Sequence, residues 1–344
     1  MRIKYLILAC AAACSVSAHA ANSINLGNYA VTGIYSLDIL NGTNGGISGL
    51  EASAVTYAQD RGTLFFVGDE GTGVIETSLT GQTISHMNFD WTGTGSTKHD
   101  IEGLTYLGGG VLVVGEERLQ DAYRFNYTAG GTATLVTSFV SMSNVAVGNN
   151  GMEGISYDPR DGSFVTIKQQ SPENILGGKL TFAAATGAPP STSEDGSSPP
   201  GGGTSTMVQL FDPTLMGLST LSDVQTLSYV NALLGTPAAD NLLVLSLGSK
   251  KLIEVSRLGQ VLSSFDLSNT LSHNAIEGVT VDEHGAIYLV AEQIQDGTQG
   301  LNPASKLIVL TAPVPEPETY AMMFAGLGLL GFMTRRKSSN PANT

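Results

Sequence analysis

The chain has 344 residues, 42 of them glycine, and carries 30 acidic against 16 basic side chains, a formal net charge of −14 at pH 7. Such an acidic surface repels nucleic acid and anionic lipid, so we expect no nucleic-acid partner. The charge is spread along the chain and forms no acidic tail, which favours a folded domain over a disordered one.

The first 20 residues are typical of a signal peptide. Arg2 and Lys4 precede an apolar run, and Ala18 and Ala20 are the small residues that a signal peptidase reads. We therefore predict cleavage by signal peptidase after Ala20 and export across the inner membrane.

Both cysteines of the chain, Cys10 and Cys14, lie in this leader. Attachment of a lipid to one of them is the alternative to simple cleavage. Residues 21–344 contain no cysteine, which excludes a disulfide, a thiolate nucleophile and a thiolate metal site from that part of the chain.

Residues 21–312 show a repeated pattern of short strands joined by turns, with few helical patterns. Five segments align, and each opens with an acidic residue: Glu51, Glu102, Glu153, Asp223 and Glu277. The intervals between these residues are 51, 51, 70 and 54, and a Pro/Gly/Ser-rich stretch of 19 residues at 186–204 accounts for the long one. Because such a composition cannot pack a core, we expect a flexible loop there.

A period of about 50 residues with four strands per repeat is typical of a β-propeller. We predict an all-β fold of about five four-stranded blades, and six blades are the alternative if residues 205–222 hold more structure. The fifth repeat shows only three strands. Strand-like segments in residues 24–40 precede the first repeat, and one of them could complete the last blade and close the ring.

The acidic residues that open the repeats are candidate metal ligands. The first strand of each propeller blade lines the central channel, so Glu51, Glu102, Glu153 and Glu277 would form a ring, with Asp223 in the fourth blade. Confined carboxylates repel one another unless a cation, a basic side chain or water relieves the charge. Calcium suits hard oxygen ligands and is our candidate cofactor. Alternatively, the repeated Glu-Gly pairs cap backbone amides and have a structural role only.

A second group of polar residues follows the second strand of the repeats: Asp69 and Glu70, Glu116 and Glu117, Lys168 and Gln169, Glu292, and Arg118 after the second pair. Of these we select five as channel-lining or ligand-binding candidates: Asp69, Glu116, Arg118, Lys168 and Glu292. The two cations could pair with the acids or hold an anionic ligand. A solvated rim is the alternative.

His99 and His273 lie just ahead of Glu102 and Glu277, so either could be a metal ligand or a general base. Loop histidines on the surface are the alternative. No pair of histidines has the spacing of a zinc site, and the sequence contains neither a Gly-x-Ser-x-Gly elbow nor a phosphate-binding loop.

The C-terminal residues 314–338 contain three parts in order. Pro315, Glu316 and Pro317 come first, an apolar run from Tyr320 to Met333 follows, and the last part is basic: Arg335, Arg336 and Lys337. The run has 14 residues, fewer than the ~20 that a full membrane span needs. We predict a short hydrophobic helix that inserts transiently into the inner membrane, with the basic residues on the cytoplasmic side.

This order of parts resembles the PEP-CTERM sorting signal. The resemblance implies recognition by an exosortase, cleavage near the Pro-Glu-Pro sequence and delivery to the periplasm, the cell surface or the extracellular matrix. Many carriers of the signal belong to bacteria that make extracellular polysaccharide, which makes such a polysaccharide a candidate partner.

The repeats resemble the SdiA-regulated (YjiK-like) family of exported propellers. The resemblance rests on LEASAVTYAQDRGTLFFVGDEG, DIEGLTYLGGGVLVVGEERLQDAYRF, MEGISYDPRDGSFVTIKQQSPENIL and AIEGVTVDEHGAIYLVAEQ, within residues 45–312. It implies a propeller with calcium in the channel region and no established reaction. The fourth repeat, which lacks the Glu-Gly pair, and the insert at 186–204 depart from the pattern.

Two functions follow as hypotheses. The first is a non-catalytic binding or matrix-associated propeller with calcium as a stabilising ion. The second is a calcium-dependent phosphoesterase or lactonase, in which the channel acids hold calcium and His99 or His273 is the base.

Overall fold

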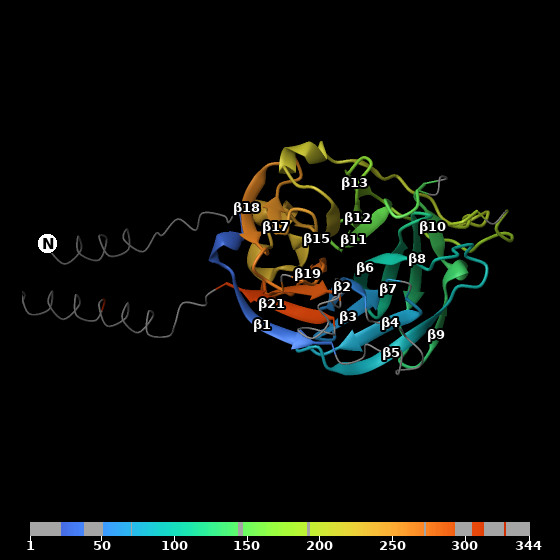
Figure 1. Cartoon of the computed structure of the whole chain (residues 1–344), viewed down its shortest axis with the longest axis horizontal. Helices are drawn as coiled ribbons and strands as arrows, with labels where there is room; N and C mark the ends of the chain where they lie inside the picture. Colours follow the sequence, from blue (N-terminus) through green and yellow to red (C-terminus); the bar gives the residue numbers. More distant parts are fainter. Residues whose placement is uncertain are drawn as a thin grey trace, which may run out of the picture. The chain divides into compact units, whose positions relative to one another are not determined.

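The computed structural model describes residues 22–37, 51–69, 71–143, 147–190, 193–271, 273–292 and 305–312, together with Leu327 (Figure 1). The chain divides into one unit that ends at Thr311 and a second unit from Ala312 to Thr344. The predicted signal peptide lies outside the described residues, as does the sorting tail apart from Leu327. Among the described residues, no helix is long and apolar enough to cross a membrane.

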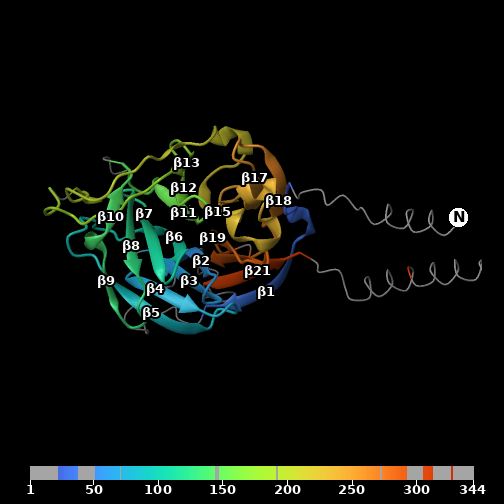
Figure 2. The same cartoon turned by 180° about the vertical axis from the view of Figure 1, so that it is seen from behind.

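Five β-sheets are arranged around a central axis and confirm the predicted five-bladed propeller, which Figure 2 shows from behind. Blade 1 contains β2 (Ala52–Ala58), β3 (Thr63–Gly68), β4 (Gly73–Thr77), β5 (Thr83–Asp90) and the added β9 (Thr132–Thr134). Blade 2 contains β6 (Ile101–Gly108), β7 (Val111–Glu116), β8 (Asp121–Asn126) and β10 (Phe139–Ser141). Blade 3 contains β11 (Met152–Asp158), β12 (Ser163–Lys168), β13 (Asn174–Gly178) and β14 (Val208–Gln209).

Blade 4 contains β15 (Leu221–Thr226), β16 (Leu242–Ser246), β17 (Lys251–Val255) and β18 (Val261–Asp266). Blade 5 contains β19 (Ile276–Val281), β20 (Ile287–Ala291), β21 (Lys306–Thr311) and β1 (Ala30–Ser36). Single 3-10 turns complete the described elements: η1 (Leu26–Asn28), η2 (Leu135–Thr137), η3 (Pro213–Met216), η4 (Leu227–Tyr229), η5 (Asn231–Leu233) and η6 (Pro237–Asp240).

The ring is closed by the N-terminal strand, as the sequence predicts. β1 pairs antiparallel with β21, from Ala30 opposite Thr311 to Ser36 opposite Lys306 (Figure 1). The segment before β1 continues onto blade 4, where the backbone N–H of Leu26 donates to Ser263 Oγ at 2.9 Å. The first strand therefore joins the last two blades, and the closed ring leaves no pair of blades unjoined.

Five apolar clusters form the core, one at each contact between neighbouring blades. Phe65 of blade 1 packs with Leu112 and Tyr123 of blade 2, for example, and all three are fully buried. Middle strands are covered on both faces, which explains why runs such as 64–67 and 242–245 are apolar without alternation.

The glycine of each Glu-Gly pair allows the inner strands to approach closely around the axis. A Cβ atom at Gly154 would lie 2.4 Å from Asp223 Oδ1 and 2.8 Å from Asp223 Cα, and at Gly278 it would lie 2.9 Å from the Ser53 carbonyl oxygen. Contacts this short do not occur, so blades 3 and 4, and blades 5 and 1, pack against bare backbone at these points.

We expect Gly154→Ala to lower the free energy of unfolding by about 2 kcal/mol, because overpacking a closed interface costs roughly 1–3 kcal/mol. Urea unfolding followed by circular dichroism measures the loss. Gly27→Ala is the control, since the nearest atom to its new Cβ would be the Asn25 side-chain oxygen at 3.2 Å. Equal losses in the two variants would contradict the role of close packing at Gly154.

The Pro/Gly/Ser-rich insert differs from the flexible loop expected for residues 186–204. Apart from residues 191 and 192, it is described and forms the far part of a hairpin in which 180–186 runs antiparallel to 200–206. Phe139 of β10 exchanges two backbone hydrogen bonds with Ala183, at 2.9 and 3.2 Å, so the hairpin adds to the outer edge of blade 2. The composition of the insert cannot show that the backbone of its hairpin forms hydrogen bonds with Phe139, which is distant in sequence.

Candidate cation centre at the channel mouth

The inner strand of every blade has the same irregularity at its start. The ladder between the first and second strands skips one residue in each blade, and these residues are Ser53, Glu102, Glu153, Ser222 and Glu277. The same backbone hydrogen bond lies beside each bulge, as from Asp69 N–H to the Glu51 carbonyl and from Glu117 N–H to the Asp100 carbonyl. The bulged residues are therefore equivalent by geometry.

This equivalence corrects the alignment of two repeats. Ser53 occupies the blade 1 position expected for Glu51, and Ser222 occupies the blade 4 position expected for Asp223. Glu51 lies two residues earlier and is the counterpart of Asp100. Asp223 instead accepts hydrogen bonds from the backbone N–H groups of Val224 and Val279, both at 2.7 Å, and so has the capping role between blades 4 and 5.

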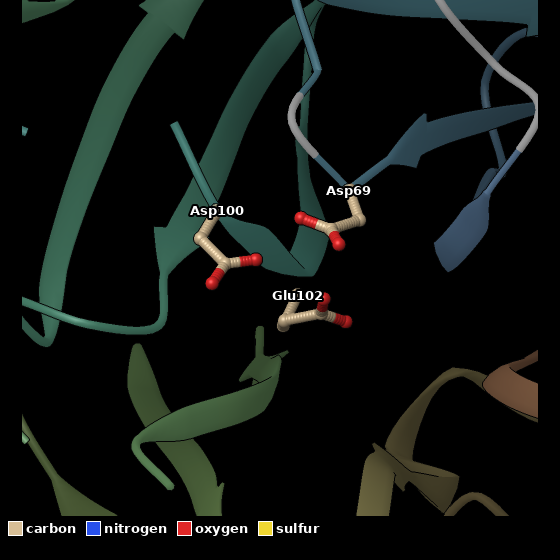
Figure 3. A group of neighbouring side chains, drawn as sticks. All are labelled: Asp69, Asp100 and Glu102. Carbon is tan, nitrogen blue, oxygen red and sulfur yellow. The ribbon is translucent and has the colours of Figure 1, made fainter. Parts of the chain in front are cut away.

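Three carboxylates meet at one end of the channel, as Figure 3 shows. Asp69 follows β3, Asp100 precedes β6, and Glu102 is the bulged residue of β6. One oxygen from each lies within 4.8 Å of the other two. Asp100 was not selected from the sequence, although an acid two residues before Glu102 in DIEG was the available signal.

Five further carboxylates surround this trio: Glu51, Glu117, Glu153, Glu277 and Glu292. Burial raises the pKa of Glu102 well above its usual value, and the charges of Glu153 and Glu277 raise it further. Glu102 and Glu277 keep partial contact with solvent, but protein atoms surround their carboxyl groups closely enough to replace most of the water there.

The two acids at the ends of the second strands also resist ionisation. Burial raises the pKa of Glu117 to about 7, although a hydrogen bond with Glu153 opposes the shift. Burial likewise raises the pKa of Glu292 to about 7, against a hydrogen bond with Glu277 and with a contribution from the charge of Glu51. Ionisation of these acids is therefore unfavourable unless a positive charge is bound beside them. We name these eight residues the carboxylate mouth: Glu51, Asp69, Asp100, Glu102, Glu117, Glu153, Glu277 and Glu292.

The far end of the channel is crossed by a tyrosine. Tyr229, in the turn after β15 of blade 4, donates its hydroxyl to the Tyr106 carbonyl of blade 2 at 3.0 Å. Blades 2 and 4 are not neighbours, so this bond passes close to the axis.

A comparison of the sequence with protein-family models finds the SdiA-regulated family over residues 33–293. The chain belongs to the SdiA-regulated family. The PEP-CTERM protein-sorting motif matches residues 313–337, directly after the last strand of the SdiA-regulated propeller. The two matches confirm the predicted family and the predicted sorting signal, and the matched range contains Pro315, Glu316, Pro317 and the basic residues 335–337.

Solved structures that resemble the SdiA-regulated propeller are distant. A luciferin-regenerating enzyme is 10% identical with a TM-score of 0.43, and the match covers 80% of this chain and 94% of that one. The β-propeller domain of Myceliophteria thermophila Cps50 (Swd1) is 12% identical with a TM-score of 0.35, over 80% and 71% of the two chains. A chain of a nidogen/laminin complex is 12% identical with a TM-score of 0.40, over 70% and 74%. Likenesses this distant carry no argument about function.

Arg118 links the carboxylate mouth of this SdiA-regulated propeller to its insert. Its Nε lies 2.5 Å from Asp100 Oδ2, one terminal nitrogen lies 3.2 Å from Asp195 Oδ1, and the other lies 2.9 Å from Asn149 Oδ1. Thr97 adds a hydrogen bond to the Glu194 carbonyl at 2.6 Å. Arg118 therefore holds the insert beside the carboxylate mouth, because its guanidinium pairs with Asp195 of the insert and with Asp100 of the mouth.

We expect Asp195→Asn to loosen the insert without unfolding the propeller. The partly exposed ion pair contributes less than about 1 kcal/mol, so the global melting temperature should fall by no more than 2–4 °C for a domain of this size. Limited proteolysis should cut within 186–204 several times faster in the variant. Asp161→Asn, which affects the surface pair with Lys179, is the control. Unchanged cleavage of the Asp195 variant would show that Arg118 does not hold the insert.

Two other candidates from the sequence lie away from the mouth. Glu116 is fully buried inside blade 2, where Ser96 Oγ donates to it at 2.8 Å and the Leu119 N–H at 2.7 Å, and burial raises its pKa to about 8. Its neighbour Glu117, and not Glu116, lies at the carboxylate mouth, at the position equivalent to Asp69 and Glu292. Lys168 donates from Nζ to the Ser171 carbonyl at 3.3 Å.

The two histidines are not members of the carboxylate trio. His99 stacks on the Trp91 ring, with centroids 4.5 Å apart and planes 11° apart, and its backbone has a positive φ of 59°. His273 is exposed. The structure therefore places one candidate base against an aromatic ring and the other at the surface.

Proposed function

We propose that this exported propeller is a non-catalytic binding protein whose carboxylate mouth holds a calcium ion. The observation that carries the proposal is the convergence of carboxylates from blades 1, 2, 3 and 5 on one end of the channel. Ionised carboxylates gathered in a largely buried site repel one another, and a divalent cation is the simplest group that would compensate several of them at once.

The donor set fits calcium. All eight ligand candidates are carboxylates, the hard oxygen ligands that calcium prefers at 2.3–2.6 Å. One oxygen from each of Asp69, Asp100 and Glu102 lies within 4.8 Å of the other two, so a single ion with such ligand distances could contact all three. Glu51, Glu102, Glu153 and Glu277, the metal-ligand candidates from the sequence, all belong to the carboxylate mouth. The other four members are Asp69, Asp100, Glu117 and Glu292.

Isothermal titration of chelator-treated protein with calcium tests this proposal. We expect one tight site in the wild type and at least tenfold weaker binding in Glu102→Gln, which keeps the shape and removes the charge. Glu194→Gln, at an exposed position in the insert, is the matched control and should bind calcium like the wild type. Absence of calcium binding to the wild type would overturn the proposal.

The sorting motif supports processing by an exosortase and export to the envelope or beyond. We further propose that signal peptidase removes residues 1–20 and that the apolar run of the tail anchors the protein transiently in the inner membrane. Extracellular polysaccharide is the proposed partner after release. Mass spectrometry of the protein from a native host would check both predicted ends.

A calcium-dependent hydrolase is the second candidate function. It is favoured by the position of the carboxylates at the end of the channel opposite Tyr229, where a cation could polarise a phosphoester or lactone and activate water. Assays with both substrate classes in the presence of calcium decide between the two functions. Turnover that disappears in Glu102→Gln would support hydrolysis, and no turnover would favour binding alone.

A further inference from the structure

Blade 4 is the exception at the carboxylate mouth. Each of the other blades contributes at least one carboxylate, whereas blade 4 presents Thr220, Ser222 and Leu247 at the three equivalent positions. Ser222 takes the place of Glu102, Glu153 and Glu277, and Leu247 takes the place of Asp69, Glu117 and Glu292. A cation at the mouth would therefore be surrounded by charge on every side except this one.

The Ser222 hydroxyl is buried without a partner. The residue is 3% exposed, and within the described part of the chain its Oγ makes no hydrogen bond. Ser53, its counterpart in blade 1, does the opposite: its hydroxyl donates to the Glu51 carbonyl at 2.9 Å and accepts from the Asp69 N–H at 3.2 Å. A buried hydroxyl left unsatisfied costs about 1–3 kcal/mol, so a bound group that paired with the Ser222 hydroxyl would stabilise this side of the mouth.

A second unsatisfied oxygen lies on the same side. Asn274 of blade 5 donates to the Glu292 carbonyl at 2.5 Å, but its Oδ1 has no partner among the described residues. Asn274 and Leu247 line a cavity of about 20 Å³ at the junction of blades 4 and 5. A cavity of this size holds one water molecule, so one ordered water fits between blades 4 and 5 next to Leu247 and Asn274.

We propose that blade 4 is the ligand side of the cation centre, where a neutral molecule with neighbouring hydroxyl groups binds the cation and the Ser222 hydroxyl together. This inference rests on the proposed cation site. Carboxylates fill the coordination positions toward the other blades, and the positions toward Ser222 stay open for oxygen atoms of a ligand. A vicinal diol supplies two such oxygens, and Leu247 offers an apolar surface to its carbon atoms.

The charge of the mouth selects a neutral ligand over an anion. One divalent ion neutralises only part of eight carboxylates, and Arg118 already contacts Asp100, Asp195 and Asn149. An added anion would meet net negative charge, whereas hydroxyl groups donate hydrogen bonds to the carboxylates that surround them. Saccharides and other polyols have this chemistry.

Terbium luminescence measures whether the coordination positions are open. Terbium substitutes for calcium, and its lifetimes in H2O and D2O give the number of bound water molecules. We expect about two waters on the ion in the wild type, because calcium-type sites take 6–8 oxygen ligands. Ser222→Asp, which places a carboxylate on blade 4, should remove about one water and bind the ion more tightly. Asn231→Asp adds the same charge at an exposed position after Tyr229 and should change neither value.

Saturation-transfer NMR with methyl α-D-glucopyranoside tests the ligand class. The signal should require calcium, disappear with chelator and disappear in Ser222→Asp, while sodium acetate should give none. Failure of the wild type to bind terbium or calcium would overturn the cation site itself. Bound terbium that carries no water, or a calcium-dependent signal from acetate equal to that of the glucoside, would overturn only the proposal for blade 4.

Discussion

Without divalent ions, the propeller should lose stability as the pH rises from about 5 to 8, and calcium should restore it. The folded state raises the pKa of Glu117 and Glu292 to about 7 by burial, and it raises the pKa of Glu102, Glu153 and Glu277 for the same reason. In the unfolded chain these groups ionise near pH 4.5. The folded state therefore holds more protons between these values, and stability falls as the pH increases.

Calcium reverses the trend because it binds ionised carboxylates and replaces the protons. At a calcium concentration 100 times the dissociation constant, binding adds about 2.7 kcal/mol to the stability. For a domain of this size we expect the melting temperature at pH 8 to rise by roughly 5–10 °C. The rise should be small at pH 5, where protons already neutralise the carboxylate mouth.

Differential scanning calorimetry with chelator and with calcium, at both pH values and constant ionic strength, measures these shifts. Sodium at matched ionic strength controls for screening of the charges. Glu102→Gln should flatten the pH dependence of the metal-free protein and reduce the effect of calcium. A melting temperature that is independent of calcium at pH 8 would contradict the cation centre.

The repeat pattern predicted the propeller because its signals are local and occur five times. Strand length, turn glycines and a period of about 50 residues are visible without knowledge of distant contacts. The closing strand could also be predicted, since a ring with three strands in its last blade has an exposed edge that only the chain start could cover. The ordered insert could not, because its partners Phe139 and Arg118 lie more than 40 residues away in sequence.

The carboxylate mouth could be predicted only in part. Glu102, Glu153 and Glu277 can be recognised in the sequence because the Glu-Gly pair opens three of the repeats. The alignment of the repeats predicts Glu51 at the position equivalent to Glu102, but the β-bulge of blade 1 lies at Ser53, which therefore has that position. The sequence does not distinguish Glu116 from Glu117, because neighbouring residues of a strand point to opposite faces and only the structure shows which face meets the axis.

Deletion of residues 22–36 from the chain without its leader should prevent the propeller from closing. The deletion removes all of β1 and exposes the edge of β21. It also removes the partners of Glu254, a fully buried carboxylate of β17 that accepts hydrogen bonds from Ser23 Oγ and from the Ile24 N–H at 3.0 Å. Glu254 would keep only its hydrogen bonds from the Asn241 amide and the Ser263 hydroxyl, both 2.8 Å long.

The expected loss exceeds about 5 kcal/mol, because a buried carboxylate that loses a partner costs roughly 1–3 kcal/mol for each hydrogen bond and an entire strand is removed in addition. Circular dichroism and gel filtration should show an unfolded or aggregated chain. Ser23→Ala is a milder variant that removes one donor and should cost about 1.5–3 kcal/mol, the contribution of a hydrogen bond to a charged group.

A synthetic peptide of residues 22–37 should restore a cooperative thermal transition to the deleted chain, since the edge of β21 would be free to pair with it. The matched control removes residues 313–344 instead, which follow β21 and belong to the second unit, and should leave the melting temperature unchanged. If the chain without residues 22–36 melted like the full propeller, β21 would not need its N-terminal partner and the ring would be stable when open. Closure by the first strand would then be a feature of the native structure that contributes little to its stability.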